Sequence, residues 1–225
     1  MSKFYVVATP IGNLGDITLR AIETLKDVDL ILCEDTRETK KILDKYGIVK
    51  PTMGYHAQSK LSKTDKIFEL LEEGKNLALV SDAGTPGISD PGALLVSKIK
   101  EYLSDSVDVI PIPGPSAIIA ALSASGLPTH EFTFLGFLPH KKGRQTAIKA
   151  IAKSEIPVVL YESPHRILKL LNELENVAPK SRVTIARELT KIHEEVLQGM
   201  PRELVQALEK GKKARGEFVV IVSKL

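Results

Sequence analysis

The sequence predicts an α/β fold built as two lobes, and three observations support this prediction. Short apolar runs rich in β-branched residues alternate with helical segments, the pattern of βαβ units and parallel sheets. The strand runs are continuously apolar, which indicates that helices cover both faces of a sheet. Proline- and glycine-rich breaks near the middle of the 225-residue chain separate two such regions.

The first region supplies strands and helices in strict alternation. Strands are expected at residues 4–8, 28–33, 77–80 and 107–110, and helices at 18–26, 37–46, 61–73 and 91–103.

The second region has a different rhythm. Strands are expected at 132–135, 158–160, 183–186 and 218–222, with a further candidate at 194–198, and helices at 143–153, 165–175 and 201–210. Breaks at 111–115 and 126–128 flank a helix expected at 116–125. We therefore expect an N-terminal α/β lobe at 1–116 and a C-terminal α/β lobe at 117–225.

Composition excludes several classes of protein. Hydrophobic residues make up 43% and charged residues 26%, as in a globular protein, and a net charge of +3 leaves RNA binding to local patches. The lone Cys33, read as a small core residue, excludes intrachain disulfides and zinc sites built on several thiolates. The apolar run at 4–8 is shorter than the about 7–15 residues of a signal peptide, and 117–127 is shorter than the about 18 needed to span a bilayer. A cytoplasmic protein is expected.

Small, rigid or charged residues follow six of the expected strands, where open α/β sheets bind ligands. A single Gly-Pro loop is usually only a turn, but six such loops together favour a ligand site. These loops lie at residues 9–16, 34–37, 81–92, 111–116, 161–166 and 187–191.

The loop at 81–92 indicates what kind of ligand is bound. The dinucleotide fingerprint and the Walker pattern are both absent from the sequence. Residues 84–92 contain no lysine, and Asp82 and Asp90 would repel phosphates while accepting hydrogen bonds from ribose or ammonium groups. A nucleoside without phosphates, such as S-adenosylmethionine, therefore fits better than a nucleoside triphosphate.

Seven segments, taken together and in order, resemble the small-subunit (16S) ribosomal RNA cytidine 2′-O-methyltransferases, of the tetrapyrrole methylase-like class of S-adenosylmethionine-dependent enzymes. They are residues 8–16, 33–37, 81–92, 113–117, 134–139, 161–166 and 187–191. The resemblance implies a mostly parallel N-terminal sheet, a mixed C-terminal sheet and the cofactor in the cleft between the lobes. It also implies methylation of the ribose 2′-oxygen of a cytidine near the ribosomal decoding centre, S-adenosylhomocysteine as product, and homodimers.

The resemblance also implies which residues bind the cofactor. Asp82 stands where the class has the Asp of a Gly-Asp-Pro loop, although its neighbours here are Ser81 and Ala83. The implied cofactor contacts are Pro10, Asp82, Thr85, Ser116, Ala117, Tyr161 and Leu189.

Methyl transfer from a sulfonium to an oxygen is an in-line displacement that depends mainly on alignment, with help from a general base. Asp35, Glu162 and Glu188 are the candidate bases, and Arg37, Arg187 and Lys191 are cationic neighbours. The predicted catalytic set is Asp35, Arg37, Glu162 and Glu188. A carboxylate paired with arginine is more often a structural ion pair, so the sequence leaves the base open.

Local basic residues are the candidates for RNA contact. Lys141, Lys142 and Arg144 are expected on one loop, and His165 and Arg166 at a helix start, although a solvated loop is the simpler interpretation. Aromatic residues are only 5% with no tryptophan, so shape and phosphate contacts are expected to dominate over base stacking. The histidines show no metal-ligand spacing, so no metal site is expected.

Two other functions remain open at this point. One is a tetrapyrrole C-methyltransferase of the same fold, and the other is a non-catalytic ribosome-assembly protein that binds RNA. The basic residues at 141–144 and 187–191 favour RNA over a tetrapyrrole.

Overall fold

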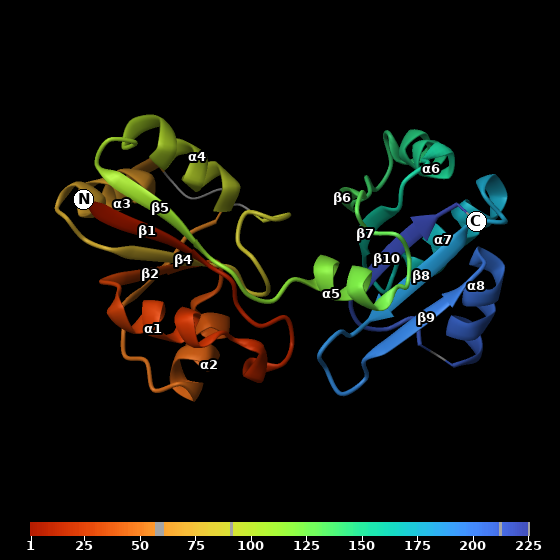
Figure 1. The fold of residues 1–225 in the computed structure, drawn as a ribbon, viewed down its shortest axis with the longest axis horizontal. Helices are drawn as coiled ribbons and strands as arrows, with labels where there is room; N and C mark the ends of the chain where they lie inside the picture. Colours follow the sequence, from red (N-terminus) through yellow and green to blue (C-terminus); the bar gives the residue numbers. More distant parts are fainter. Residues whose placement is uncertain (57–60, 91, 212, 225) are drawn as a thin grey trace. The chain divides into compact units, whose positions relative to one another are not determined.

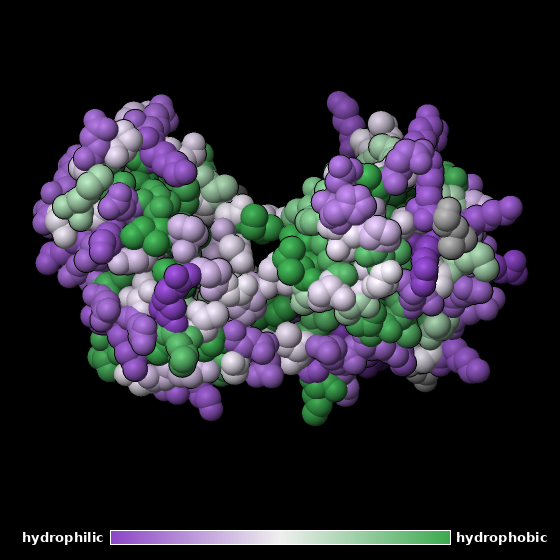
Figure 2. Space-filling view, in the orientation of Figure 1, coloured by the Kyte–Doolittle hydropathy of each residue, from purple (hydrophilic) through white to green (hydrophobic). Residues whose placement is uncertain are grey.

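A computed structural model gives the structure of the protein and describes residues 1–56, 61–90, 92–211 and 213–224. The chain divides into two compact units, unit 1 (Met1–Ser116) and unit 2 (Ala117–Leu225), each with its own sheet (Figure 1). On the face shown in Figure 2, hydrophilic residues cover much of the surface of each unit, and hydrophobic residues lie among them. None of the helices in the described part of the chain is long and apolar enough to cross a membrane.

Unit 1 is a five-stranded parallel sheet with strand order β3-β2-β4-β1-β5. Its strands are β1 (Ser2–Val7), β2 (Leu30–Cys33), β3 (Thr52–Gly54), β4 (Leu77–Val80) and β5 (Val107–Ile112). Its helices are α1 (Leu19–Asp27), α2 (Thr36–Lys45), α3 (Leu61–Glu72) and α4 (Gly92–Tyr102), with a 3₁₀ turn, η1 (Leu14–Asp16), after β1.

Helices cover both faces of this sheet, as the continuously apolar strands predict. Within β1, Phe4 packs in the cluster that contains residues of α3 and α4, whereas Val7 packs in the cluster that contains residues of α1 and α2. The side-chain oxygens of Thr18 and Asp35 cap the first turns of α1 and α2. Because all five strands run in parallel, the loops that follow them meet at one edge of the sheet.

Unit 2 is a mixed five-stranded sheet with strand order β6-β7-β10-β8-β9. Its strands are β6 (Thr133–Phe137), β7 (Val158–Glu162), β8 (Arg182–Arg187), β9 (Glu195–Gly199) and β10 (Phe218–Ser223). β6 and β7 are parallel, and the other neighbouring pairs are antiparallel. Since β7 and β8 both run opposite to β10, strands β6, β7 and β8 end at the same edge.

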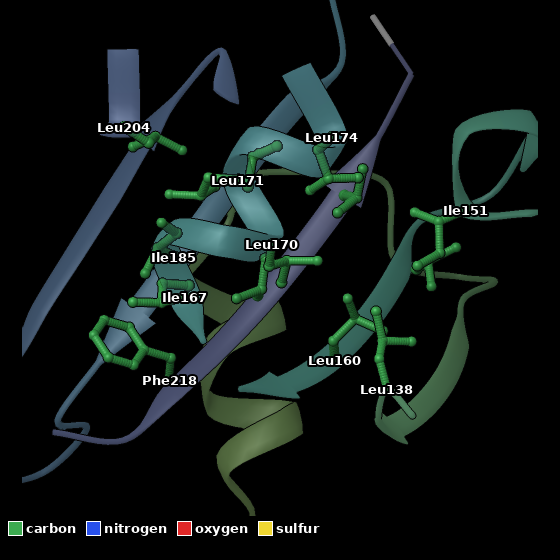
Figure 3. Packing of buried hydrophobic residues seen from close by; sticks show 14 of the residues in the cluster. Leu138, Ile151, Leu160, Ile167, Leu170, Leu171, Leu174, Ile185, Leu204 and Phe218 are labelled. Carbon is green, nitrogen blue, oxygen red and sulfur yellow. The ribbon is translucent and has the colours of Figure 1, made fainter. Parts of the chain in front are cut away.

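The main core of unit 2 lies between the sheet and helices α6 (Arg144–Lys153), α7 (Ile167–Val177) and α8 (Pro201–Lys210). Figure 3 shows Ile167, Leu170 and Leu174 of α7 against this sheet, together with Leu160 of β7 and Phe218 of β10. The apolar spacing along α7 places Ile167, Leu170 and Leu174 on one face of the helix. Helix α5 (Ala117–Ala124) packs on the opposite face of the sheet.

The predicted fold class is confirmed, with one parallel and one mixed sheet. Three details differ from the sequence prediction. The short strand β3 is absent from the prediction, and β5 continues through Pro111, which the sequence pattern places in a loop. Proline is tolerated there because β5 is an edge strand. Tyr161 and Glu162 belong to β7 and not to the following loop. Pro91, the expected start of a helix, lies outside the described residues, and α4 begins at Gly92.

The packing of α7 leads to a stability prediction. Replacing the fully buried Leu170 by alanine leaves a cavity and should lower the free energy of unfolding by about 2–5 kcal/mol. The measurement is the urea midpoint of unfolding at constant m value. Leu19→Ala is the control, because Leu19 is 79% exposed and its replacement should change the free energy by less than about 0.5 kcal/mol. Equal effects of the two substitutions would contradict the packing described here.

Candidate active site

The loops after β1, β4 and β5 of unit 1 are hydrogen-bonded to one another. The backbone N–H of Thr9 donates to the carbonyl of Gly84 at 2.9 Å, and the N–H of Gly84 donates back to the carbonyl of Thr9 at 3.1 Å. The buried Thr9 hydroxyl also donates to the carbonyl of Ser81 at 2.9 Å. The Thr85 hydroxyl donates to the carbonyl of Pro115 at 3.3 Å. These contacts bring the segments of the predicted cofactor residues Pro10, Thr85 and Ser116 together.

The loop after β2 joins the same edge. The backbone N–H of Asp35 donates to Oδ1 of Asp82 at 2.9 Å. Asp82 is exposed, so its carboxylate is accessible to a ligand. Five of the predicted site residues therefore lie on hydrogen-bonded loops at one edge of unit 1, namely Pro10, Asp35, Asp82, Thr85 and Ser116.

Two glycines allow this close approach of the loops. Gly84, which pairs with Thr9, has a φ of +81°, a left-handed conformation that costs glycine little. A Cβ added to Gly114 would lie 2.9 Å from Cβ of Ala8, closer than side chains pack. Glycine at position 114 therefore lets the loop after β5 rest against the end of β1.

The edge of unit 1 is acidic. Partial burial raises the pKa of Glu34, and the negative charges of Asp82 and Asp90 raise it further. Asp90 also orders the loop before α4, because its Oδ1 accepts hydrogen bonds from the N–H groups of Gly87 at 2.7 Å and Gly92 at 2.8 Å. Such an edge suits hydroxyl or ammonium donors and disfavours phosphates.

Asp35 is an anion fixed by its neighbour Arg37. The Arg37 guanidinium donates to both carboxylate oxygens and, with the backbone N–H of Arg37, lowers the pKa of Asp35 to about 2. A carboxylate of such low basicity is a poor proton acceptor near neutral pH. The Arg37 side chain itself is 86% exposed.

In unit 2, three predicted cofactor residues pack against the same hydrophobic cluster. Ala117, Tyr161 and Leu189 come from α5, β7 and the loop after β8, and all three contact the cluster on the α5 face of the sheet. The ring centroids of Tyr161 and Phe134 lie 5.1 Å apart, edge to face. The structure thus gathers these three residues on one face of unit 2.

The loop that carries Leu189 has an unusual backbone. Glu188 and Thr190, which flank Leu189, have positive φ values of 49° and 66°. Such conformations cost energy in residues other than glycine and are retained where the surroundings enforce them. Here Oε1 of Glu188 accepts hydrogen bonds from the N–H of Glu217 and from Nζ of Lys191, both at 3.0 Å.

The surroundings of Glu188 also determine its charge. Burial alone would raise the pKa of Glu188, but the hydrogen bond from the N–H of Glu217 and the Lys191 ammonium outweigh burial and lower it. A Cβ on Gly216 would lie 2.5 Å from Glu188, so glycine at 216 makes room for this side chain. Glu188 is therefore an anionic anchor of the loop and a weak base.

A buried ion network lies where β7 ends. The Glu162 side chain is 0% exposed, and its oxygens lie 3.2 Å from Nε of Arg166 and 3.7 Å from Nη1 of Arg144. Arg144 is 3% exposed and also pairs with Glu173 of α7 at 2.8 Å. Charges buried this deeply are tolerated because each has a partner of opposite sign.

This network corrects the sequence interpretation of three residues. The sequence predicts that Arg144 contacts RNA, but Arg144, at the start of the expected helix, is buried by its pairing with Glu162 and Glu173. Glu162 is a candidate base by sequence, but a fully buried carboxylate between two arginines has no access to a substrate hydroxyl. Arg166 is a predicted RNA contact, but its side chain is only 14% exposed and pairs with Glu162.

The two arginines hold the loop between β6 and α6. Nη2 of Arg166 donates to the carbonyl of Leu138 at 2.6 Å, and Nη1 of Arg144 donates to the carbonyl of Pro139 at 3.5 Å. The predicted RNA contacts Lys141, Lys142 and His165 remain exposed at this edge. Glu173 escapes the sequence analysis, because a partner 29 positions away leaves no signal in a single sequence.

Lys212 lies outside the described residues. Within the ranges that the structure describes, no three His, Cys, Asp or Glu residues are grouped so that they could hold a metal ion.

Comparison with known proteins gives one family and one fold. Residues 3–205 match the family model described as Tetrapyrrole (Corrin/Porphyrin) Methylases. The chain is 46% identical to ribosomal RNA small subunit methyltransferase I of Synechocystis sp., covering 99% of this chain and 79% of that protein. It is 44% identical to the protein of the same name from Thermotoga maritima, covering 99% of each.

Solved structures show a similar fold at low identity. The methyltransferase CobJ has a TM-score of 0.71 at 18% identity, covering 99% of this chain and 93% of that chain. Diphthine synthase has a TM-score of 0.71 at 15% identity, covering 99% and 90%. At these identities the likeness concerns the fold alone.

The buried network predicts a large effect for a small chemical change. Glu162→Gln keeps the shape of the side chain but removes the buried negative charge that pairs with Arg144 and Arg166. The free energy of unfolding should fall by roughly 3–5 kcal/mol, measured by urea denaturation. Glu155→Gln is the control, because Glu155 forms an exposed pair with Lys224 and should change stability by less than about 1 kcal/mol. A Glu162 variant as stable as this control would contradict the network.

The Asp35–Arg37 pair predicts a pH dependence. The folded-state pKa of Asp35 is about 2, below its ordinary value of 3.8, so the pair stabilises the fold above pH 3.8 and loses this contribution as the pH falls towards 2. In Arg37→Ala the pKa of Asp35 should rise towards 3.8, as followed by carboxyl-carbon NMR titration. An unchanged titration would show that Arg37 does not govern the charge of Asp35.

Proposed function

Since the chain belongs to the tetrapyrrole methylase family, and within it to the ribosomal RNA small subunit methyltransferase I proteins, we propose the following reaction. The protein transfers a methyl group from S-adenosylmethionine to the ribose 2′-oxygen of a cytidine in 16S ribosomal RNA, near the decoding centre. Membership of this family confirms the resemblance seen in the sequence motifs. The substrate atom, the cofactor and the site residues are the parts that we propose.

The observation that carries the proposal is the acidic edge of unit 1. There Asp82 accepts a hydrogen bond from the N–H of Asp35, and hydrogen bonds join the loops after β1, β4 and β5. These carboxylate acceptors fit S-adenosylmethionine, which has ribose hydroxyls and an ammonium group to donate and no phosphates. When bound, the cofactor supplies a methyl group on a positively charged sulfur and becomes S-adenosylhomocysteine. The proposed contacts are Pro10, Asp82, Thr85, Ser116, Ala117, Tyr161 and Leu189.

The residues of this chain contribute mainly by positioning. In-line displacement depends on the alignment of oxygen, carbon and sulfur, and fixed loops provide alignment. The Asp82 carboxylate would accept hydrogen bonds from the cofactor, while Glu188 fixes the backbone around Leu189. Asp35 and Glu188 have lowered pKa values and Glu162 is buried, so we propose that these three carboxylates position groups and do not accept the hydroxyl proton.

RNA is proposed to bind through exposed cations. Lys141 and Lys142 of unit 2 and Arg37 of unit 1 are exposed, and contacts of cations with phosphates supply most of the affinity for RNA. We propose His165 as a further contact at the same edge of unit 2. The proposal includes the small ribosomal subunit as partner, assembly as a homodimer, and a cytoplasmic location.

The decisive experiment measures transfer of a labelled methyl group to 16S RNA from cells that lack this protein. A 2′-O-methyl group blocks alkaline cleavage of the adjacent phosphodiester, because the 2′-hydroxyl is the attacking group in that cleavage. One protected position at a cytidine is the expected result. Label on a tetrapyrrole and none on RNA would instead favour a tetrapyrrole methyltransferase. RNA binding without any binding of S-adenosylmethionine in calorimetry would favour a non-catalytic assembly protein.

Asp82 gives a test of the cofactor site. Asp82→Ala removes a charged hydrogen-bond acceptor and should weaken S-adenosylmethionine binding by about 10- to 100-fold in calorimetry. Asp105→Ala is the matched control, because Asp105 is an exposed aspartate in the turn before β5, at the opposite edge of the sheet. A control that loses as much affinity as Asp82→Ala would contradict the proposed site.

The lysines give a test of RNA contact. The double substitution Lys141→Ala and Lys142→Ala removes two phosphate contacts, and the slope of log affinity against log salt concentration should decrease by about 1.4. Lys149→Ala with Lys153→Ala is the control, since these lysines are exposed on α6 and removing them changes the net charge equally. Equal loss of slope in both variants would indicate a general charge effect and no specific contact.

A further inference from the structure

Strand β6, at the edge of the unit 2 sheet, contains an irregularity in its pairing with β7. Phe134 pairs with Val159 and Phe137 pairs with Tyr161, so three steps along β6 correspond to two steps along β7. Gly136, inside this interval, has a φ of +62°, in the left-handed region. One extra residue with a left-handed glycine defines a β-bulge, a feature that re-aims side chains.

The bulge changes the face on which Phe137 lies. In a regular strand, residues 134 and 137 would point to opposite faces of the sheet. Here both rings pack against Tyr161, with centroid distances of 5.1 Å for Phe134 and 5.5 Å for Phe137. Leu138, four residues after Phe134, packs in the cluster on the other face of the sheet. The bulge therefore turns Phe137 towards the face that carries Tyr161 and Leu189.

Phe137 stays exposed in this position. Its side chain is 56% exposed, while Phe134 and Tyr161 beside it are partly buried. A single exposed phenylalanine is ordinary on a protein surface. Here, however, the ring follows a bulge and packs against Tyr161 at an interplanar angle of 51°. The result is an exposed aromatic face beside a second aromatic ring.

The same short segment carries positive charge. Lys141 and Lys142 are exposed four and five residues after Phe137. The segment between Phe137 and these lysines accepts two hydrogen bonds, from Arg166 at the Leu138 carbonyl and from Arg144 at the Pro139 carbonyl. An aromatic face beside cations on a braced loop is the combination that binds single-stranded nucleic acid, where bases stack and phosphates pair.

We propose that Phe137 is a stacking platform for an unpaired base of the RNA substrate, with Lys141 and Lys142 contacting the adjoining phosphates. This proposal rests on the proposed function and adds to it that the RNA is single-stranded where it meets β6. It differs from the sequence expectation that shape and phosphate contacts dominate over stacking. The cationic surroundings favour RNA over the adenine of S-adenosylmethionine as the stacked group, because that cofactor has no phosphate.

The test compares two substitutions at position 137 with a control at position 132. Phe137→Leu keeps an apolar side chain but removes the aromatic face, and should weaken binding of a single-stranded fragment of the substrate RNA by about 5- to 150-fold. Phe137→Tyr keeps the face and should bind that RNA as the wild type does. Affinity for S-adenosylmethionine should be unchanged in both variants. Phe132→Leu, an exposed phenylalanine outside the bulge, is the matched control.

Phe137→Trp adds a direct observation of stacking. The chain has no tryptophan, so the introduced indole would be its only one, and stacking on a base should quench its fluorescence. Quenching by the single-stranded fragment and much less by its duplex is the expected result. Equal quenching by both would overturn the proposal.

Three further outcomes distinguish a failure of this proposal from a failure of the function on which it rests. Wild-type RNA affinity in Phe137→Leu, with normal methylation by the wild type, would overturn the stacking role and leave the function standing. Loss of affinity for S-adenosylmethionine in that variant would also overturn it, by assigning Phe137 to the cofactor. Failure of the wild type to methylate 16S RNA would overturn the proposed function and the stacking proposal with it.

Discussion

Shared strand direction is the constraint on which the candidate site depends. Parallel strands end at one edge of the sheet. Segments that are distant in sequence, such as those of Thr9, Asp35 and Asp82, therefore become neighbours there. The two backbone hydrogen bonds between Thr9 and Gly84 then join two of these loops in an isolated antiparallel bridge. In unit 2, β6, β7 and β8 obey the same rule although the sheet is mixed, because β10 runs against both of its neighbours.

Charges are used differently in the two units. At the edge of unit 1 the carboxylates are accessible, and only Asp35 among those discussed is neutralised by a guanidinium, so the edge keeps a negative character. In unit 2 the carboxylates of Glu162 and Glu188 are turned inward and hold arginine, lysine and backbone groups in place. The exposed Lys141 and Lys142 of unit 2 carry positive charge beside these inward-facing carboxylates. The described edge of unit 1 is thus acidic, and that of unit 2 presents exposed lysines.

The sequence predicts the fold well and the site unevenly, for physical reasons. The strand at 77–80 and the helix at 201–210 are predicted from the hydrophobic pattern of their own residues. The structure places both where they are expected. β3 escapes prediction because three residues carry no periodicity. The interpretation of Arg144, Glu162 and Arg166 fails because burial and pairing with Glu173 depend on contacts made only in three dimensions. The placement of Asp82 and Thr85 beyond the end of β4 is predictable because the strand topology sets it.

The bulge in β6 makes the position of the Phe137 ring depend on the backbone conformation of Gly136. Deleting one residue between positions 134 and 137 would restore the regular two-residue alternation and keep Phe137 opposite Tyr161, because the bulge holds one extra residue. Loss of the bulge with all its residues present would have the opposite effect, since three regular steps from Phe134 place the Phe137 ring on the other side of the sheet. A residue at position 136 that disfavours a left-handed backbone should therefore be more harmful than a single-codon deletion there, and grafting this surface onto another scaffold would require the glycine as well as the aromatic ring.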